Sequence, residues 1–361
     1  MRGSNAQQLR YILDEQDTFS TDAEPAPELV QFFQIPSHLL TTVNRRSNGF
    51  FSCAETFNQD GELQSTYTWF RVLVKMAARD ASSSYSWHEM TFCSRWVSSR
   101  CTILCIGAYS LFRGLLQDGL VQLGTTLQPS EPYSLHIPLV EAIVAMQDLS
   151  VWSVRNIVRS VEKASTLAAQ DRSLPTRESQ GFLMMHEAAR HAIHSFETLS
   201  VTVETVEAMQ RHVVHLASKS KQKSGNEPDT LSQVRTHMAF QASMLRNLLL
   251  RSQSNKERMQ NEIALAYNMI AQRDSQVMTG LGEAARRDSG AMRTIAVVTM
   301  AFLPPTFLSA IFSMSFFNYT PEHGSAGWSV SGKLWVYWVC AVPLTCITLM
   351  IWYWRQRRVG S

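Results

Sequence analysis

Two long stretches without any charged side chain restrict this chain more than any other feature of its sequence. One runs from Thr294 to Pro321 and the other from Leu334 to Trp354, which is 28 and 21 residues, whereas Cys101–Phe112 reaches only 12. A helix needs about 20 apolar residues to cross the hydrocarbon of a bilayer. We therefore expect two transmembrane helices, over residues 294–317 and 334–354.

The ends of these stretches carry the residues that orient membrane helices. Aromatic residues mark both boundaries, for example Tyr319 and Trp335 on one side and Trp354 on the other. Arginines gather next to the chain termini, and the connection over 318–333 holds only Lys333 against Glu322. Because basic residues favour the cytosolic side, we expect both termini in the cytosol and the 318–333 loop outside. The arginines concerned are Arg286, Arg287, Arg293, Arg355, Arg357 and Arg358.

A very long helix is expected to lead into the first span. No proline occurs between Pro228 and Pro304, and apolar residues recur there at intervals of three and four, which is typical of an amphipathic helix. We expect this stalk helix over 229–293, continuous with the span at 294–317. Such a helix must bury its apolar stripe against its own domain or against other copies of itself.

The upstream residues predict a mixed cytosolic domain. Two long antiparallel helices are expected at about 136–169 and 177–219, and residues 67–78, 86–97 and 100–107 have the composition of strands. The fold class is therefore an α+β cytosolic domain over 29–228, followed by the stalk helix and two C-terminal spans. A disordered polar tail is expected over 1–28, and a basic cytosolic tail over 355–361.

Composition excludes several classes of function. The net charge is only +3 and no basic stripe is interleaved with aromatics, so no nucleic-acid partner is expected. The six cysteines lack paired metal-ligand spacing, which favours a reduced, cytosol-facing setting and a packing role for Cys101 and Cys105. No phosphate-binding glycine loop, Gly-x-Ser-x-Gly or His-Glu-x-x-His motif occurs, so we expect no enzyme.

One face of the first span carries hydroxyls among its apolar side chains. At about 100° per residue, seven positions fall within an arc of roughly 80°, and the opposite side is bulky and apolar. Hydroxyls in hydrocarbon either join helices or line a hydrated path. Both interpretations stay open at this point, and conduction would require an oligomer with this helix innermost. The seven candidate pore-lining residues are Met292, Ile295, Thr299, Leu303, Thr306, Ala310 and Ser313.

A helical histidine motif is the candidate for a regulatory metal site. Glu187, His191 and His194 lie on adjoining faces of the predicted helix over 177–219, and His212 and His215 form a second pair three residues apart. Helical histidine pairs bind zinc in many proteins. The plainer interpretation is a solvated helix face with pairs such as Glu187 and His191.

The stretch AMRTIAVVTMAFLPPTFLSAIFSM, residues 291–314, resembles the first span of the CorA-type magnesium transporter family. It is similar in the basic residue, the apolar run, Phe-x-Pro-x-Thr-Phe and the closing aromatic-x-Met, and YTPEH resembles the family's outer loop. The resemblance covers roughly residues 285–358. It is greatest to a fungal branch of the family that shares the Arg-Thr-Ile-Ala and Phe-Ser-Met pattern and lacks Gly-Met-Asn.

The resemblance implies a homopentamer, with the first spans around an axial pore and the long helices forming a funnel. It implies a transported or regulatory divalent cation, Mg²⁺ first and Co²⁺, Ni²⁺ or Zn²⁺ as alternatives, and no covalently bound cofactor. At the outer mouth the family carries Gly-Met-Asn, whereas Ser313, Met314 and Ser315 stand here. These three residues are the candidate selectivity site, with Glu322 in the outer loop nearby.

Two functions from different classes follow. The first is a passive channel or transporter for divalent cations, driven by the electrochemical gradient. The alternative is a membrane-anchored oligomeric scaffold of the same fold that does not conduct. The partners expected are other copies of the chain, the lipid bilayer and divalent cations. The expected location is a membrane crossed more than once, the plasma membrane first and an organelle membrane as the alternative.

Overall fold

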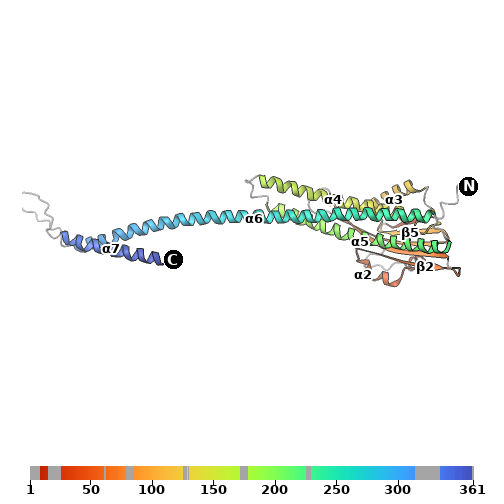
Figure 1. Cartoon of the computed structure of the whole chain (residues 1–361), viewed down its shortest axis with the longest axis horizontal. Helices are drawn as coiled ribbons and strands as arrows, with labels where there is room; N and C mark the ends of the chain where they lie inside the picture. The colour runs from red at the N-terminus through yellow and green to blue at the C-terminus, as the bar shows by residue number, and fades with distance from the viewer. Residues whose placement is uncertain are drawn as a thin grey trace, which may run out of the picture. The chain divides into compact units, whose positions relative to one another are not determined.

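The computed structural model describes residues 9–14, 26–60, 62–78, 85–124, 128, 130–170, 178–224, 229–313 and 334–359. It divides into two compact units, Met1–Tyr267 and Asn268–Ser361. Figure 1 shows the α+β part, the long helix and the C-terminal helix in chain order. This order is the architecture that the resemblance implies, and the expected fold class is confirmed.

A five-stranded sheet forms the centre of the first unit. Its strands are β1 (Leu9–Asp14), β2 (Gly49–Phe57), β3 (Leu63–Ala77), β4 (Tyr85–Val97) and β5 (Arg100–Ile106), in the order β1-β5-β4-β3-β2. β2 to β5 pair antiparallel, and β1 joins β5 in parallel. The three stretches expected as strands are confirmed as β3, β4 and β5.

The expectation of a disordered tail over 1–28 is wrong for two segments. Leu9–Asp14 pairs with Cys101–Ile106 as strand β1, and helix α1 begins at Pro27. The physical reason for β1 lies in β5, which without it would leave a row of unpaired backbone N–H and C=O groups at the sheet edge. Proline at the first position of α1 is favourable because its missing N–H needs no partner there.

The two faces of the sheet carry separate apolar cores. Phe70 and Phe92 lie on the face covered by helices, whereas Trp69 and Cys93 face the segment around Phe33. The indole N–H of Trp69 donates to the Phe33 carbonyl at 3.0 Å. Alternation along β3 and β4 thus places neighbouring residues in different cores. The segment at the second face comprises α1 (Pro27–Phe32), η1 (Ser37–Leu40) and α2 (Thr42–Arg45).

Three helices cover the first face of the sheet: α3 (Ser110–Leu123), α4 (His136–Gln170) and α5 (Glu178–Ser224). The helices expected at about 136–169 and 177–219 correspond to α4 and α5. Sequence reasoning did not assign α3, whose two glycines lower its helix propensity.

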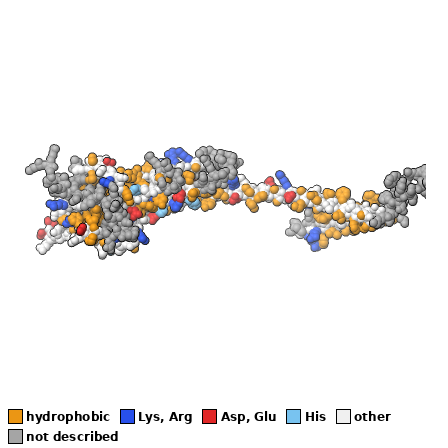
Figure 2. All heavy atoms as spheres, turned by 180° about the vertical axis from the view of Figure 1, so that it is seen from behind, with side chains coloured by type: hydrophobic (Ala, Val, Ile, Leu, Met, Phe, Trp, Pro, Cys, Tyr) orange, Lys and Arg blue, Asp and Glu red, His pale blue; other side chains and the backbone are white. Residues whose placement is uncertain are grey.

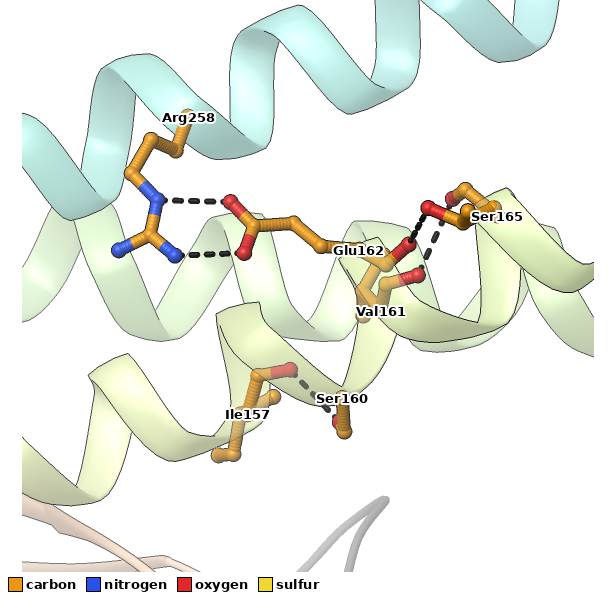
Figure 3. A network of polar contacts seen from close by, with 7 residues as sticks. Ile157, Ser160, Val161, Glu162, Ser165 and Arg258 are labelled. Carbon is orange, nitrogen blue, oxygen red and sulfur yellow. Dashed lines mark hydrogen bonds and ion pairs between the residues drawn. The ribbon is translucent and has the colours of Figure 1, made fainter.

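Helix α6 (Asp229–Phe312) begins in the first unit and packs there on α4 and α5. Leu231, Val234 and Met238 enter the main core, and Met259 packs with Val154 and other α4 residues. Arg258 forms two hydrogen bonds with Glu162 of α4, at 2.6 and 2.5 Å (Figure 3). These bonds hold the pKa of Glu162 below its usual range. The apolar stripe of the expected stalk is therefore buried on its own domain as far as Met259.

The second unit contains the rest of α6 and helix α7 (Leu334–Val359). Three helices of the described structure are long and apolar enough to cross a membrane: α4, α6 and α7. The apolar stretch that could cross a membrane is 61% buried in α4, whereas the corresponding stretches of α6 and α7 are each only 6% buried. The apolar surface of α4 is thus buried inside the folded domain, whereas the apolar surfaces of α6 and α7 are exposed in the single chain.

Candidate functional site

The predicted pore-lining residues share an uncovered face of α6. All seven are exposed in the single chain, with Met292, Ile295 and Leu303 at 63, 66 and 59%. Exposed apolar residues of this size are unusual in a soluble surface and typical of a face that meets lipid or another subunit. The helix brings these residues into one stripe.

Helix α7 packs on the opposite face of α6. Pro304 is buried and Pro305 is half-buried, and the Tyr337 hydroxyl donates to the Pro305 carbonyl at 3.2 Å. Ala341 of α7 is 2% exposed. At about 100° per residue, Pro304 and Pro305 lie roughly 140° and 120° from the centre of the stripe. Helices α6 and α7 therefore pair without using the hydroxyl-bearing face, which is left for other molecules.

The hydroxyls on this face recur at a regular interval. Thr299, Thr306 and Ser313 follow one another every seven residues, about 10 Å along a helix. Thr299 Oγ1 donates to the Ile295 carbonyl at 2.8 Å, and Thr306 Oγ1 donates to the Phe302 carbonyl at 2.8 Å. Since the hydroxyl hydrogens of Thr299 and Thr306 are used within the helix, the lone pairs of these two oxygens are left as acceptors.

The outer end of the stripe is only partly described. Ser313 lies one residue beyond α6, and its N–H donates to the Ser309 carbonyl at 2.8 Å. The other two residues of the candidate mouth, Met314 and Ser315, lie outside the described residues, as does Glu322 of the loop.

The residues of the helical histidine motif have mostly protein partners of their own. Glu187 pairs with Arg190, and the Nδ1 atom of His194 lies 3.6 Å from Glu197. His191 is 4% exposed, and its Nδ1 atom is without a hydrogen-bond partner among the described residues. Within the described part of the chain, no group of three or more His, Cys, Asp or Glu could hold a metal ion.

A lysine that sequence reasoning missed lies in this region. Lys75 is 5% exposed, and its Nζ lies 4.5 Å from the ring centre of Tyr85 and 5.0 Å from that of Trp87. The His191 ring packs against Tyr85 at 5.8 Å. Burial and the nearby Arg190 lower the pKa of Lys75, while burial and Lys75 lower the pKa of His191. A buried lysine thus lies next to the helical histidine motif.

Of the second histidine pair, His212 belongs to a half-buried hydrogen-bonded network, whereas His215 is exposed. His212 of α5 contacts the Tyr133 hydroxyl through Nδ1 and Glu55 of β2 through Nε2. Lys219 also bonds Glu55, at 3.2 Å. Burial lowers the pKa of His212 even though Glu55 opposes the shift. This network fastens α5 to the edge strand β2, and sequence spacing gave no sign of it.

The cysteines have no redox partner. All six are free, and burial raises the pKa of Cys93 and of Cys101 to about 12. The packing role expected for Cys101 and Cys105 is confirmed, since both are buried in β5.

Comparisons with known proteins give one sequence relative and several structures of low similarity. No family model matches the chain. The notoamide biosynthesis cluster protein M' of Aspergillus versicolor is 30% identical over 223 residues, 60% of this chain and 47% of the relative. The chain therefore spans about half the length of that relative.

Among solved structures, full-length CmaX has a TM-score of 0.44 at 11% identity, covering 97% of this chain and 88% of CmaX. The CorA magnesium transporter of Methanocaldococcus jannaschii has a TM-score of 0.40 at 13% identity, covering 94 and 88%. The ZntB cytoplasmic domain of Vibrio parahaemolyticus has 0.35 at 8%, covering 66 and 84%. All three TM-scores lie below 0.5, so the function is argued from the residues themselves.

Proposed function

We propose that this chain is a CorA-like membrane protein whose copies assemble, as a homopentamer, around a path for divalent cations. The observation that carries the proposal is the hydroxyl stripe of α6, which resembles the family's first span and remains uncovered when α7 packs. Two spans cannot enclose a pore, so the path requires several copies with this face innermost. Transport is passive and uses no covalent chemistry.

The chemistry of the stripe fits a hydrated cation. Mg²⁺ sheds water reluctantly and is often held through its hydration shell. Hydroxyl oxygens at Thr299, Thr306 and Ser313 accept hydrogen bonds from such water, and the hydroxyl hydrogens of the two threonines already bond the helix backbone. Leu303 lies between the two threonines, and a ring of such side chains acts as a hydrophobic constriction. Rings of hydroxyl groups and rings of apolar side chains thus alternate along the proposed path.

At the mouth, Ser315 offers a shorter acceptor than the asparagine of the family pattern. Ser313, Met314 and Ser315 would determine which cation enters, Mg²⁺ first and Co²⁺, Ni²⁺ or Zn²⁺ as alternatives. Both termini are proposed to lie in the cytosol, with the plasma membrane favoured over an organelle membrane.

Cation flux into liposomes that contain the purified protein tests the proposal. Thr306→Val removes one polar level and is expected to slow flux roughly tenfold, the factor for about 1.4 kcal/mol at a barrier. Ser315→Leu is expected to slow it at the mouth. Thr294→Val is the matched control, because Thr294 also bonds a backbone carbonyl, that of Gly290 at 3.1 Å, but lies outside the stripe.

The second candidate is a CorA-like oligomeric scaffold that does not conduct. The replacement of Gly-Met-Asn by Ser-Met-Ser favours it, and the 30% identical relative is named for a biosynthesis cluster. If no flux of Mg²⁺, Co²⁺, Ni²⁺ or Zn²⁺ exceeds that of empty vesicles, the scaffold is the function that remains. A stable monomer in native mass spectrometry would contradict both candidates.

A further inference from the structure

Basic side chains from both helices of the second unit gather at one end of their pair. Tyr337 lies against Pro305, and Trp352 lies against Arg293, so α7 runs antiparallel to α6. This register brings the last turns of α7 alongside the part of α6 that precedes Arg293. Figure 2 shows basic side chains at this end and hydrophobic surface along the rest of the pair. The basic residues are Arg286, Arg287, Arg293, Arg355, Arg357 and Arg358.

Three of these arginines are stacked on aromatic rings. Arg358 lies 3.9 Å from the ring centre of Trp354, and Arg357 lies 5.0 Å from that of Tyr353. Arg293 lies 5.7 Å from the ring centre of Trp352. A guanidinium that stacks on a ring presents its N–H groups in the plane of the guanidinium, where they can donate to a phosphate. Tryptophan and tyrosine favour the headgroup level of a bilayer.

The charge balance at this end is strongly positive. Six arginines stand against two acidic residues, Glu283 and Asp288, in the segments next to the spans. The C-terminal end of α7 is also the negative end of a helix dipole, which favours arginines in its last turn. The excess of positive charge therefore lies at one end of the α6–α7 pair, at the depth where lipid phosphates lie if the spans cross a bilayer.

We propose that this arginine cluster binds the headgroups of anionic phospholipids in the cytosolic leaflet. The stacked guanidinium groups of Arg357 and Arg358 donate to the phosphate, and the rings beneath them pack on the upper part of the acyl chains. Arg293 supplies a further charge from α6. The inference rests on the two-span part of the proposed function and is independent of transport.

Native mass spectrometry of the full-length protein, released from nanodiscs of mixed phosphatidylglycerol and phosphatidylcholine, tests this proposal. The wild type is expected to retain phosphatidylglycerol several-fold above its share of the mixture. Each arginine near an anionic surface contributes about a fivefold preference, so Arg357→Gln/Arg358→Gln is expected to lose most of the enrichment. Arg357→Lys/Arg358→Lys keeps the charge but loses the planar fork, and we expect intermediate retention.

Arg251→Gln is the matched control. Arg251 also stacks on an aromatic ring, 4.6 Å from that of Trp152, but belongs to the first unit, so lipid retention is expected to be unchanged. Flotation of each variant with liposomes shows separately whether the spans insert, which keeps a failure of the two-span assignment apart from a failure of lipid binding.

Salt gives a test on the wild type alone. Raising the ionic strength from 0.05 to about 0.5 M shortens the screening length and should reduce the enrichment. Equal retention of both lipids by inserted wild-type protein, or enrichment that survives the double Gln substitution, would overturn the proposal.

Discussion

At the scale of single residues, Gly107 shows how tightly the end of β5 is built. Its φ is +72°, and an added Cβ would lie 2.0 Å from the Glu89 carbonyl oxygen. Gly107→Ala is therefore expected to lower the free energy of unfolding by about 3 kcal/mol or more, through backbone strain and a clash that cannot relax locally. Denaturant unfolding of the purified protein measures it.

Gly114 provides the matched substitution for this test. It lies inside α3, and nothing comes within 4 Å of an added Cβ. Gly114→Ala should therefore leave stability unchanged or raise it by up to about 1 kcal/mol, as alanine favours the helix. Similar effects of the two substitutions would contradict the geometry at Gly107.

His136 is the residue whose burial makes stability depend on pH. It is 1% exposed, its Nε2 lies 3.0 Å from Thr68 Oγ1, and burial lowers its pKa to about 3. In the unfolded chain His136 binds a proton with a pKa near 6.5, whereas in the folded protein it binds one only near pH 3. Stability is therefore lost as pH falls below about 6.5, by about 2 kcal/mol between pH 7 and pH 5 from this residue alone.

Thermal unfolding at a series of pH values, for the wild type and His136→Phe, isolates this contribution. The substitution removes the titrating group while keeping a ring of similar size, so the decline between pH 7 and 5 should become shallower by that amount. Burial also lowers the pKa of His212, so His212 still contributes part of the decline of stability with falling pH in the variant. An unchanged slope would show that His136 does not titrate on unfolding.

Residue patterns predicted the hydroxyl stripe but not the environment of the histidines. Thr299 and Thr306 belong to one continuous helix, so their shared face follows from helical periodicity alone. Lys75, Tyr85 and His191 come from β3, β4 and α5, and only strand pairing brings them together. Local spacing carries no information on such contacts, which is why sequence reasoning missed Lys75 beside the histidine motif.

At the scale of secondary structure elements, some strands and helices could be predicted from their own sequence and others could not. β3 and α4 carry their own signals, a run of β-formers and a helical period. Strand β1 is a six-residue edge strand stabilised by β5, and α3 contains Gly114 and Gly119. Their structure depends on the partner elements, so a reading of local sequence did not find them.

The continuity of α6 extends the stripe beyond the span. At about 100° per residue, Asp274 and Asp288 lie on the same face as Met292 and Thr299, and α6 is unbroken across these positions. In an assembly with this face innermost, each aspartate forms a ring of carboxylates that concentrates cations at the inner entrance. Asp288→Asn is therefore expected to lower cation flux several-fold at low ionic strength and less at high salt.

Glu283→Gln is the control for Asp288→Asn. It removes the same charge five residues away, but Glu283 lies roughly on the opposite side of α6 from the stripe. Flux in liposomes should respond to the first substitution and hardly to the second. Equal effects of both would indicate general surface charge rather than a cation path along this face.

At the scale of the whole molecule, the three hydrophobic core clusters of the described residues lie entirely within residues 26–259. Helix α6 contributes to them only through its first part, and its residues from 271 to 295 are exposed in the single chain. The helix therefore has two functions along its length. Its first turns complete a folded domain, and its later turns present an uncovered surface.

Truncation at two points of α6 tests this division. A fragment of residues 1–267 retains every apolar α6 residue of the clusters and is expected to fold cooperatively, as circular dichroism during denaturation would show. A fragment of residues 1–228 loses those side chains, of which the six larger than alanine are each worth about 1.5–3 kcal/mol of burial. Their sum, about 9–18 kcal/mol, is as large as the whole 5–15 kcal/mol by which domains are usually stable, so the shorter fragment should not fold. Cooperative unfolding of the shorter fragment would mean that α6 packs on a domain that is already stable without it. The residues removed are Leu231, Val234, Met238, Ala242, Leu245, Leu248 and Met259.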